Sequence, residues 1–274
     1  MVSPPAWIFA PYYYGLKRTE DGISERVRAW TSQAVHAGDV IETHLVETEP
    51  SDGILPRPVP FSVVYEDDDI LVVDKPADTP IHPSIGNYEN TLANGIAWYF
   101  EQKGEPFVYR CINRLDRDTT GLIVLAKHAL SAAVLSQAMR SREIHRTYQA
   151  FALGETAASG TIDAPIARLN GSLIQRTVDF ASGERSVTHY RTLAHCSVFS
   201  HLELNLETGR THQIRVHMAY IGHPLLGDTL YNKTPGTFPR QALHSASLSF
   251  VHPITGEPLN FHAPLPEDMQ NLLT

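Results

Sequence analysis

The chain has 274 residues, of which 42% are hydrophobic and 19% charged, and its formal net charge is −8 at pH 7. This length and composition are typical of a globular protein that buries a substantial core, as one domain or as a main domain with a small appendage. They exclude a membrane-spanning protein, because no apolar run is long enough, and the N-terminus has no secretion-signal pattern. The two cysteines, Cys111 and Cys196, lie in no metal-like or redox-like spacing, so we expect a reduced, cytoplasmic setting.

The negative charge is unevenly distributed along the chain. Residues 38–78 hold eleven acidic residues against two basic ones, a balance of −9. Residues 110–150 hold seven Lys and Arg against three acids, a balance of +4. Because the local potential at a contact surface decides whether phosphates bind there, the basic segment permits a nucleic-acid partner that the net charge alone would argue against.

Residues 1–60 carry few clear patterns. Residues 11–14 (Pro-Tyr-Tyr-Tyr) and 37–41 (Ala-Gly-Asp-Val-Ile) indicate a few short strands. The prolines between residues 50 and 60 are typical of a linker. We therefore expect an N-terminal segment over residues 1–60 and a main domain over residues 61–274.

The main domain begins with a predicted hairpin. Residues 62–65 and 70–73 are β-rich runs on either side of an acidic turn. A loop punctuated by prolines follows, and it contains Lys75 and His82. This loop precedes the first helical segment.

Two segments have the apolar spacing of amphipathic helices. They are residues 91–103 and residues 129–142. In the second helix, the residues that we expect to face inward are Leu130, Ala133, Val134 and Ala138.

Between these helices, a short polar loop runs directly into an apolar strand. The loop places Asp116 between Arg114 and Arg117, and these opposite charges should lower the pKa of Asp116 and keep it anionic. Residues 122–126 have the composition of a buried central strand, and Gly121 marks the change from loop to strand. An ionised carboxylate presented by a rigid sheet is a candidate nucleophile or electrostatic stabiliser. The alternative is a structural network of aspartate and arginine.

The strand expected over residues 144–153 contains Arg146 and Tyr148. Taken alone, Tyr148 is typical of an ordinary strand aromatic. It follows the Asp116 loop by about one strand–helix–strand unit, which sets it apart from an ordinary strand aromatic.

A second segment rich in Arg and His follows the alternating strand expected at residues 202–206. Thr211 is a good N-cap for a helix that ends near Ile221. The N-terminus of this helix, just after Arg210 and beside His212, is a candidate anion site suited to a backbone phosphate.

The histidines of the same segment raise the alternative of a metal site. His212, His217 and His223 are separated by five and then six residues, which does not place three imidazoles on one face of a helix. No cysteine or acidic residue lies among them. We therefore expect no metal, and the chain has no glycine-rich phosphate loop that would indicate another cofactor.

Three of these segments together resemble the motifs of RNA pseudouridine synthases of the RluA type. They occur in the family's order within residues 61–250, and the third is the most specific. The segments are Arg-Leu-Asp-Arg-Asp-Thr-Thr-Gly-Leu (114–122), His-Arg-Thr-Tyr-Gln-Ala (145–150) and Thr-Gly-Arg-Thr-His-Gln-Ile-Arg-Val-His (208–217), the last continued by Gly222–Asp228 and Leu243–His244. An early Lys-Pro and His-Pro pair, at Lys75 and His82, also matches. Two positions depart from the family pattern: Asn113 stands where His is usual, and Arg146 where Lys is common.

The resemblance implies an α+β fold, a mixed, mostly antiparallel sheet with flanking helices and a cleft across its middle. The strand-rich sequence with only a few helical patterns agrees with this fold class. Residues 37–41 are similar to the closing strand of the S4 RNA-binding module, so we interpret residues 1–60 as a partial, S4-like segment plus a linker.

The resemblance also assigns roles to individual residues. It implies that Asp116 is the catalytic residue, that Arg215 pairs with it, and that Tyr148 faces the target base. The residues expected to contact RNA are Arg114, Arg210 and His212 at phosphate or sugar, and Lys75 and His82 at the rim of the cleft.

The implied reaction is the isomerisation of uridine to pseudouridine in structured rRNA or tRNA, by a cytoplasmic monomer that uses no cofactor. A uridine in a loop or bulge is expected, because extruding a base from a helix costs more. Asn113 and the negative net charge motivate one alternative, a non-catalytic RNA-binding chaperone on the same fold. A second alternative is a carboxylate-dependent glycosidase, which needs another acid such as Asp118 or Glu143.

Overall fold

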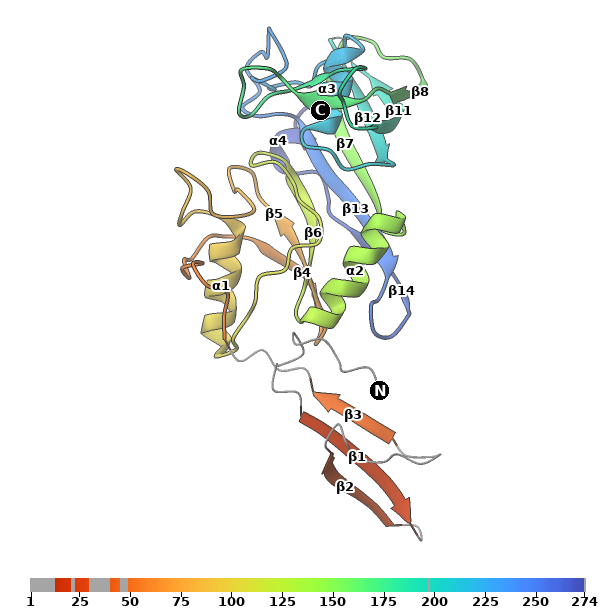
Figure 1. Ribbon diagram of the computed structural model, residues 1–274. Coiled ribbons are helices and arrows are strands. Elements are labelled where there is room, and N and C mark those ends of the chain that lie inside the picture. Colours follow the sequence, from red (N-terminus) through yellow and green to blue (C-terminus); the bar gives the residue numbers. More distant parts are fainter. Residues whose placement is uncertain (1–12, 21–22, 30–39, 45–48, 197, 274) are drawn as a thin grey trace. The chain divides into compact units, whose positions relative to one another are not determined.

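The computed structural model describes residues 13–20, 23–29, 40–44, 49–196 and 198–273 (Figure 1). The chain divides into two compact units, Met1–Pro50 and Ser51–Thr274. In the first unit, antiparallel strands form a sheet in the order β2-β1-β3, with β1 at Tyr13–Glu20, β2 at Ile23–Ala29 and β3 at Val40–His44.

The strands expected near residues 11–14 and 37–41 overlap β1 and β3. The rest of both segments lies outside the described residues. The S4-like interpretation of residues 1–60 depends in part on them and stays a prediction.

The second unit is organised around a nine-stranded mixed sheet with the order β4-β5-β6-β13-β7-β12-β11-β8, and β14 pairs with β13 (Figure 1). Of the strand pairs described in this sheet, β6–β13 is parallel and the others are antiparallel. This is the mixed, mostly antiparallel α+β architecture that was predicted. The strands are β4 (Ser62–Glu66), β5 (Ile70–Lys75), β6 (Thr120–Ala126), β7 (His145–Leu153), β8 (Ser159–Asp163), β11 (Val187–His195), β12 (Phe199–Leu206), β13 (Leu243–Val251) and β14 (Pro258–His262), with a separate ribbon of β9 (Ile166–Arg168) and β10 (Arg176–Val178).

The helices of the second unit are α1 (Leu92–Lys103), α2 (Ala129–Ser141), α3 (Gln213–Tyr220) and α4 (Glu267–Gln270). The helix predicted at residues 91–103 is present as α1. Thr91 caps its N-terminus in a capping box with Asn94, and Gly104, with a φ of 72°, ends it in the left-handed conformation. Over the residues described, no helix has both the length and the apolar composition needed to cross a bilayer.

Residues 51–60 belong to the second unit, so the linker predicted there is corrected to part of the main domain. The Arg57 amide donates a hydrogen bond of 3.1 Å to the Asn94 carbonyl of α1. This segment lies against the helix because Gly95 has no side chain: a Cβ there would lie 2.5 Å from the Val59 carbonyl oxygen.

The helix predicted at residues 129–142 is present as α2, but its predicted inward face is wrong at three of four residues. Leu130 and Val134 are 49% and 38% exposed and Ala133 is exposed too, whereas Ala138 packs against the core and Leu135 is fully buried. Apolar residues lie on both sides of this helix, so their spacing did not determine which side faces the sheet. His128, itself buried, caps the helix N-terminus with its side chain.

Strand β6 lies at the centre of the core, as its apolar run predicted. Leu122, Ile123, Val124, Leu125 and Ala126 are all fully buried. Their side chains alternate between two apolar clusters, one shared with α1 and α3 and the other with α2. The strand is therefore covered on both faces, and the loop that precedes it is held by a rigid base.

Gly121 determines how β6 pairs with β13. Its φ is 111°, and a Cβ there would collide with the backbone of Ser245. Ser245 is in register with Gly121 on one side and with Tyr148 of β7 on the other. The Asp116 loop and Tyr148 are thus brought together across a single residue of β13.

Candidate active site

Asp116 lies in the tight loop before β6, and Arg215 reaches it from α3. The Arg215 Nη1 donates a hydrogen bond of 3.0 Å to the Asp116 Oδ2, and the Asp116 side chain is 24% exposed. The ion pair expected from the sequence is therefore formed, at a carboxylate that remains accessible from the cleft.

Asp228 holds the other side of the Arg215 guanidinium. Nε and Nη2 donate to its two carboxylate oxygens at 2.7 and 2.9 Å, and Asp228 is fully buried. Burial alone would lower the pKa of Arg215, but the two carboxylates, Asp228 foremost, raise it overall, so the guanidinium stays charged. A bidentate contact on one edge fixes the direction in which Nη1 points, toward Asp116.

The sequence analysis did not assign a role to Asp228. A signal was present: an aspartate that follows the apolar stretch Pro224–Leu226 after a single glycine is in a position to be buried, and a buried carboxylate needs a cation. The backbone amides of Leu230 and Tyr231 also donate to Asp228, so its oxygens are well supplied with donors.

Tyr148 lines the same pocket as Asp116 and Arg215. It lies on β7 between β12 and β13 and is only 4% exposed. The structure therefore brings together the three side chains that the resemblance assigned to catalysis, and their chemical roles stay predictions.

Lys75 does not lie at the rim of the cleft, and the prediction that it contacts RNA is wrong. Its side chain is fully buried, and Nζ donates 2.8 Å hydrogen bonds to the carbonyls of Pro76 and Arg117. Burial lowers the pKa of the Lys75 ammonium to about 7, although Asp118 and Asp116 act in the opposite direction. Lys75 supports the Asp116 loop from inside the protein.

Arg240 supports the same loop from a second direction. Its Nη1 donates to the Asp118 carbonyl at 3.1 Å, while Nε and Nη2 bind the carboxylate of Asp268 at 2.7 and 2.9 Å. Lys75 and Arg240 thus hold two successive carbonyls of the loop. These two buried side chains fix the backbone of the loop from behind, and no spacing pattern in the sequence indicated either contact.

Asn113 joins the two ends of the loop. Its side-chain amide donates to the Leu122 carbonyl at 3.1 Å and accepts from the Val124 amide at 2.9 Å. The residue is 3% exposed. At this position, where the family usually has His, the side chain has a structural function, and the departure leaves the Asp116 carboxylate in place.

Arg117 does not neutralise Asp116. It forms an ion pair with Asp78 on the opposite side of the loop, with its Nε 2.6 Å from the Asp78 carboxylate. The prediction that Arg117 acts on Asp116 is therefore wrong: residues adjacent in sequence point to different sides of a tight turn.

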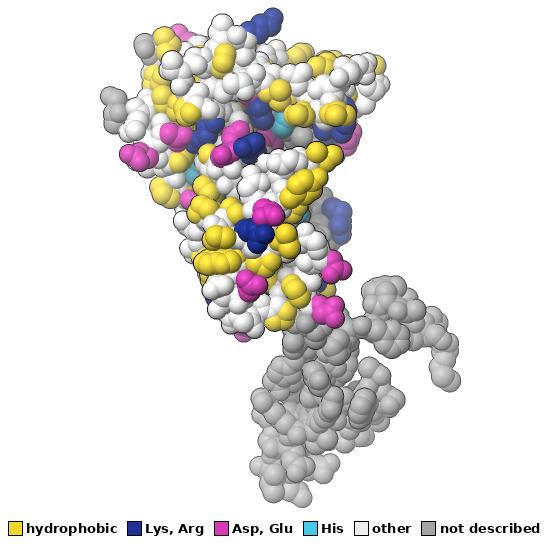
Figure 2. Space-filling view, turned by 90° about the vertical axis from the view of Figure 1, so that its left-hand side faces the viewer, with side chains coloured by type: hydrophobic (Ala, Val, Ile, Leu, Met, Phe, Trp, Pro, Cys, Tyr) yellow, Lys and Arg dark blue, Asp and Glu magenta, His cyan; other side chains and the backbone are white. Residues whose placement is uncertain are grey.

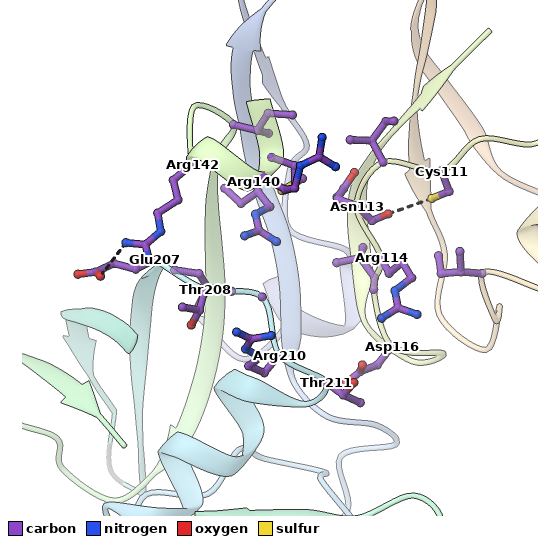
Figure 3. Close-up of a pocket in the computed structure, with 18 of the residues that line it drawn as sticks. Cys111, Asn113, Arg114, Asp116, Arg140, Arg142, Glu207, Thr208, Arg210 and Thr211 are labelled. Carbon is purple, nitrogen blue, oxygen red and sulfur yellow. Dashed lines mark hydrogen bonds and ion pairs between the residues drawn. The ribbon is translucent and has the colours of Figure 1, made fainter. Parts of the chain in front are cut away.

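A cleft of about 730 Å³ extends from Asp116 (Figure 3). Five arginines and two acidic residues line it, so its lining is basic although the whole chain is acidic. These residues are Arg114, Arg140, Arg142, Arg146, Arg210, Asp116 and Glu207.

The residues predicted to contact RNA differ in whether their side chains already have partners within the protein. Arg114 lines the cleft and makes no hydrogen bond or ion pair within the part of the chain that the structure describes. His82 also lines it and packs edge-on against Tyr109. Arg210 is paired with Glu184 at 2.5 Å, so an RNA phosphate would have to compete with a carboxylate there.

His212 lies between Tyr231 and Asp116. The Tyr231 hydroxyl accepts from the Arg176 amide at 2.8 Å and lies 2.8 Å from the His212 Nδ1. The other ring nitrogen of His212, Nε2, lies 3.8 Å from the Asp116 carboxylate. Burial lowers the pKa of His212, which favours the neutral imidazole.

The helix cap predicted at Thr211 is wrong by one residue. His212, with a φ of 58°, precedes α3 and makes no side-chain cap. Instead, the Gln213 side chain accepts from the Arg210 amide at 3.0 Å and from the Thr208 hydroxyl at 2.8 Å. This contact orders the turn that carries Arg210 and His212.

The histidines considered as metal ligands have separate partners. His217 contacts Thr188 and Ala164, and His223 contacts the Leu153 carbonyl. Among the described residues, the group with metal-like spacing is instead Asp67, Asp69 and His252, away from the cleft lining.

Hydrogen bonds already satisfy this group. The His252 Nδ1 accepts from the amides of Ile254 and Thr255, so Nε2 carries the proton that it donates to Asp67 at 3.0 Å. A nitrogen that carries a proton is no metal ligand, and the three residues do not fit an ion.

Comparison with solved structures shows the pseudouridylate synthase fold. Human RNA Pseudouridylate Synthase Domain Containing 1 superimposes with a TM-score of 0.63 at 26% identity, covering 79% of this chain and 86% of the human one. The family model described as RNA pseudouridylate synthase matches residues 69–220, which include Asp116, Tyr148 and Arg215.

Curated relatives agree with this result. An uncharacterized RNA pseudouridine synthase of Bacillus subtilis is 43% identical over 86% of this chain and 83% of its own length. Ribosomal large subunit pseudouridine synthase D of Vibrio cholerae is also 43% identical, over 86% of this chain and 76% of its own. The chain belongs to the RNA pseudouridine synthase family.

Proposed function

We propose that this chain isomerises uridine to pseudouridine in large-subunit ribosomal RNA, with Asp116 as the catalytic residue. The observation that carries the proposal is the accessible Asp116 carboxylate, paired with Arg215 in an arginine-lined cleft of a member of this family. Relatives from Vibrio cholerae and Escherichia coli are named as large-subunit ribosomal enzymes, which favours rRNA over tRNA.

The reaction breaks the N1–C1′ bond of uridine, turns the uracil and joins C5 to C1′. C5 loses a proton and N1 gains one, so substrate and product have the same composition. Within the described residues, the Asp116 Oδ2 accepts from Arg215 and Oδ1 has no hydrogen-bond partner, which leaves one oxygen available to the substrate. An anionic carboxylate in this position promotes cleavage of the glycosidic bond, where positive charge develops on the ribose.

Tyr148 and Arg215 complete the proposed machinery. The buried Tyr148 ring offers an aromatic surface to the extruded uracil, and its hydroxyl is the proposed acceptor of the C5 proton. Arg215, fixed by Asp228, holds the Asp116 carboxylate in position through its Nη1. Closure of RNA over the cleft keeps the detached base from escaping.

The substrate context follows from this geometry. The target uridine has to leave its stack to reach Asp116, so a loop or bulge in the RNA is favoured over a continuous helix. One chain supplies Asp116, Tyr148 and Arg215, which supports action as a monomer. A ribosomal RNA substrate would place the enzyme in the cytoplasm.

The test is tritium release from large-subunit rRNA labelled at C5 of uridine, with product analysis of the RNA. We expect release together with an equal amount of pseudouridine. RNA binding without release would favour the non-catalytic chaperone, and free uracil would favour the glycosidase. Either result would overturn the proposal.

A further inference from the structure

The arginines that line the cleft fall into two classes. Arg142 and Arg210 are paired with carboxylates, Glu207 at 3.4 Å and Glu184 at 2.5 Å. Arg114, Arg140 and Arg146 are not: no ion pair to any of them is made by the residues that the structure describes. On the face shown in Figure 2, Lys and Arg side chains lie interspersed with Asp and Glu side chains.

Arg146 is the exceptional member of the unpaired class. It projects from β7, two residues before Tyr148, and is partly buried. Over the described residues, its Nε is the single buried side-chain nitrogen or oxygen without a hydrogen-bond partner. Its guanidinium lies against the backbone at Gly209, where a Cβ would be 3.2 Å from the Nη1.

A partly buried arginine without these partners lacks the interactions that would stabilise its charge. Arg cannot lose its proton at any ordinary pH, so a partly buried guanidinium needs either a counter-charge or hydrogen-bond acceptors. The described residues supply neither, although Glu207 lines the same cleft and is instead bound by Arg142, Arg185 and His189. The missing acceptor is therefore expected from outside the protein.

Arg140 is a second arginine of the cleft without a carboxylate partner among the described residues. It lies near the C-terminal end of α2 and lines the same cleft as Arg146 (Figure 3). Its guanidinium contacts only the neutral Gln137 side chain among the described residues, at 2.9 and 3.2 Å. Figure 3 shows Arg140 and Asp116 in different parts of the cleft, so an anion at Arg140 would not displace Arg215 from Asp116.

We propose that Arg146 and Arg140 form a second phosphate subsite, which holds a backbone phosphate of the RNA strand that flanks the target uridine. This inference rests on the proposed function, because it takes the occupant of the cleft to be RNA. Guanidinium groups bind phosphate oxygens in a bidentate manner, and such contacts set the register of a strand without reading its sequence. The subsite thereby positions the strand so that the uridine reaches Asp116.

The experiment measures RNA affinity as a function of salt, with a stem–loop RNA that contains an unpaired uridine. Arg146→Gln should weaken binding about tenfold and lower the slope of log affinity against log salt by about 1, as expected for one lost phosphate contact. Arg146→Lys should keep the slope. Arg191→Gln, which removes an arginine paired with Glu203 outside the cleft lining, should change neither quantity.

Two further measurements distinguish a failure of this inference from a failure of the proposed function. The loss in Arg146→Gln should lie mainly in affinity, and the single-turnover rate at saturating RNA should fall by a smaller factor than the affinity does, since the residue acts in binding. Should wild type modify no RNA, the proposed function fails, but the salt slopes still report on the subsite. Unchanged affinity and slope in both Arg146→Gln and the exposed Arg140→Gln would overturn the inference, even if one of them were destabilised.

Discussion

Asp116 and Asp67 are two carboxylates with nearly the same exposure and different hydrogen-bond environments. Their side chains are 24% and 26% exposed, and each is within hydrogen-bond distance of a cationic or imidazole group. Asp67 accepts four hydrogen bonds, from the amides of Asp69 and Ile70, from the Tyr65 hydroxyl and from His252. Asp116 accepts one, from Arg215.

Hydrogen-bond saturation, and not exposure, therefore separates the structural aspartate from the one that we propose to be catalytic. Both carboxylate oxygens of Asp67 already accept hydrogen bonds, and these join the β4–β5 turn to residues 252–255. Asp116 is held firmly by its backbone and by one guanidinium, and it keeps acceptor capacity for a substrate. Arg146 is the corresponding case among the basic residues: its buried Nε has no hydrogen-bond partner among the described residues, so it keeps donor capacity for an anion.

The largest expected effect is that of Asp116→Asn. The amide keeps the shape of the side chain but removes the charge, so the single-turnover rate should fall by about 10⁴-fold or more. RNA affinity should change less than threefold or so, because the contacts to phosphate remain. Rapid-quench assays and binding titrations measure both quantities. A variant that kept a tenth of the rate would place the chemistry elsewhere.

Asp228→Asn tests whether Asp228 positions the Arg215 guanidinium toward Asp116. Loss of the bidentate contact leaves a buried guanidinium with one partner, which should lower the free energy of unfolding by about 3 kcal/mol and the rate by about 10²-fold. Denaturant titration and single-turnover kinetics measure the two effects. If the rate stayed at the wild-type value, Asp228 would have no part in positioning Arg215.

Lys75→Met tests the support beneath the loop through its pH dependence. Unfolded lysine titrates near 10.4 whereas the pKa of folded Lys75 is about 7, so the unfolded chain binds more protons between these values. The stability of wild type relative to Lys75→Met should therefore rise with pH, by about 2–3 kcal/mol from pH 6 to 9. Denaturant midpoints over this range provide the measurement. A flat difference would show that Lys75 remains charged in the fold.

Asp67→Asn should have the smallest effect on activity and a modest one on stability. An amide can accept at only one of the two positions that now receive donors, so unfolding should become easier by about 1–2 kcal/mol. The single-turnover rate should stay within about twofold of wild type. A large loss of rate at full folding would remove the distinction between the two aspartates.

Much of the fold, and the position of the Asp116 site, could be predicted from local patterns in the sequence. The apolar run after Gly121 predicted the central strand, because five consecutive apolar residues are buried on both faces. The inward face of α2 was not predictable from apolar spacing, since apolar residues lie on both its exposed and its buried sides. Long-range contacts were also out of reach: Lys75 is buried beneath the Asp116 loop by a contact between residues 42 positions apart.

The most direct test of the account is made on ribosomal RNA from cells. Pseudouridines would be mapped in a strain that lacks this gene and then in strains that express wild type, Asp67→Asn or Asp116→Asn at equal protein levels. We predict that at least one pseudouridine of the large-subunit RNA is lost with the gene and returns with wild type and Asp67→Asn, but not with Asp116→Asn. Return of the modification with Asp116→Asn would contradict the claim that this unsaturated carboxylate performs the reaction.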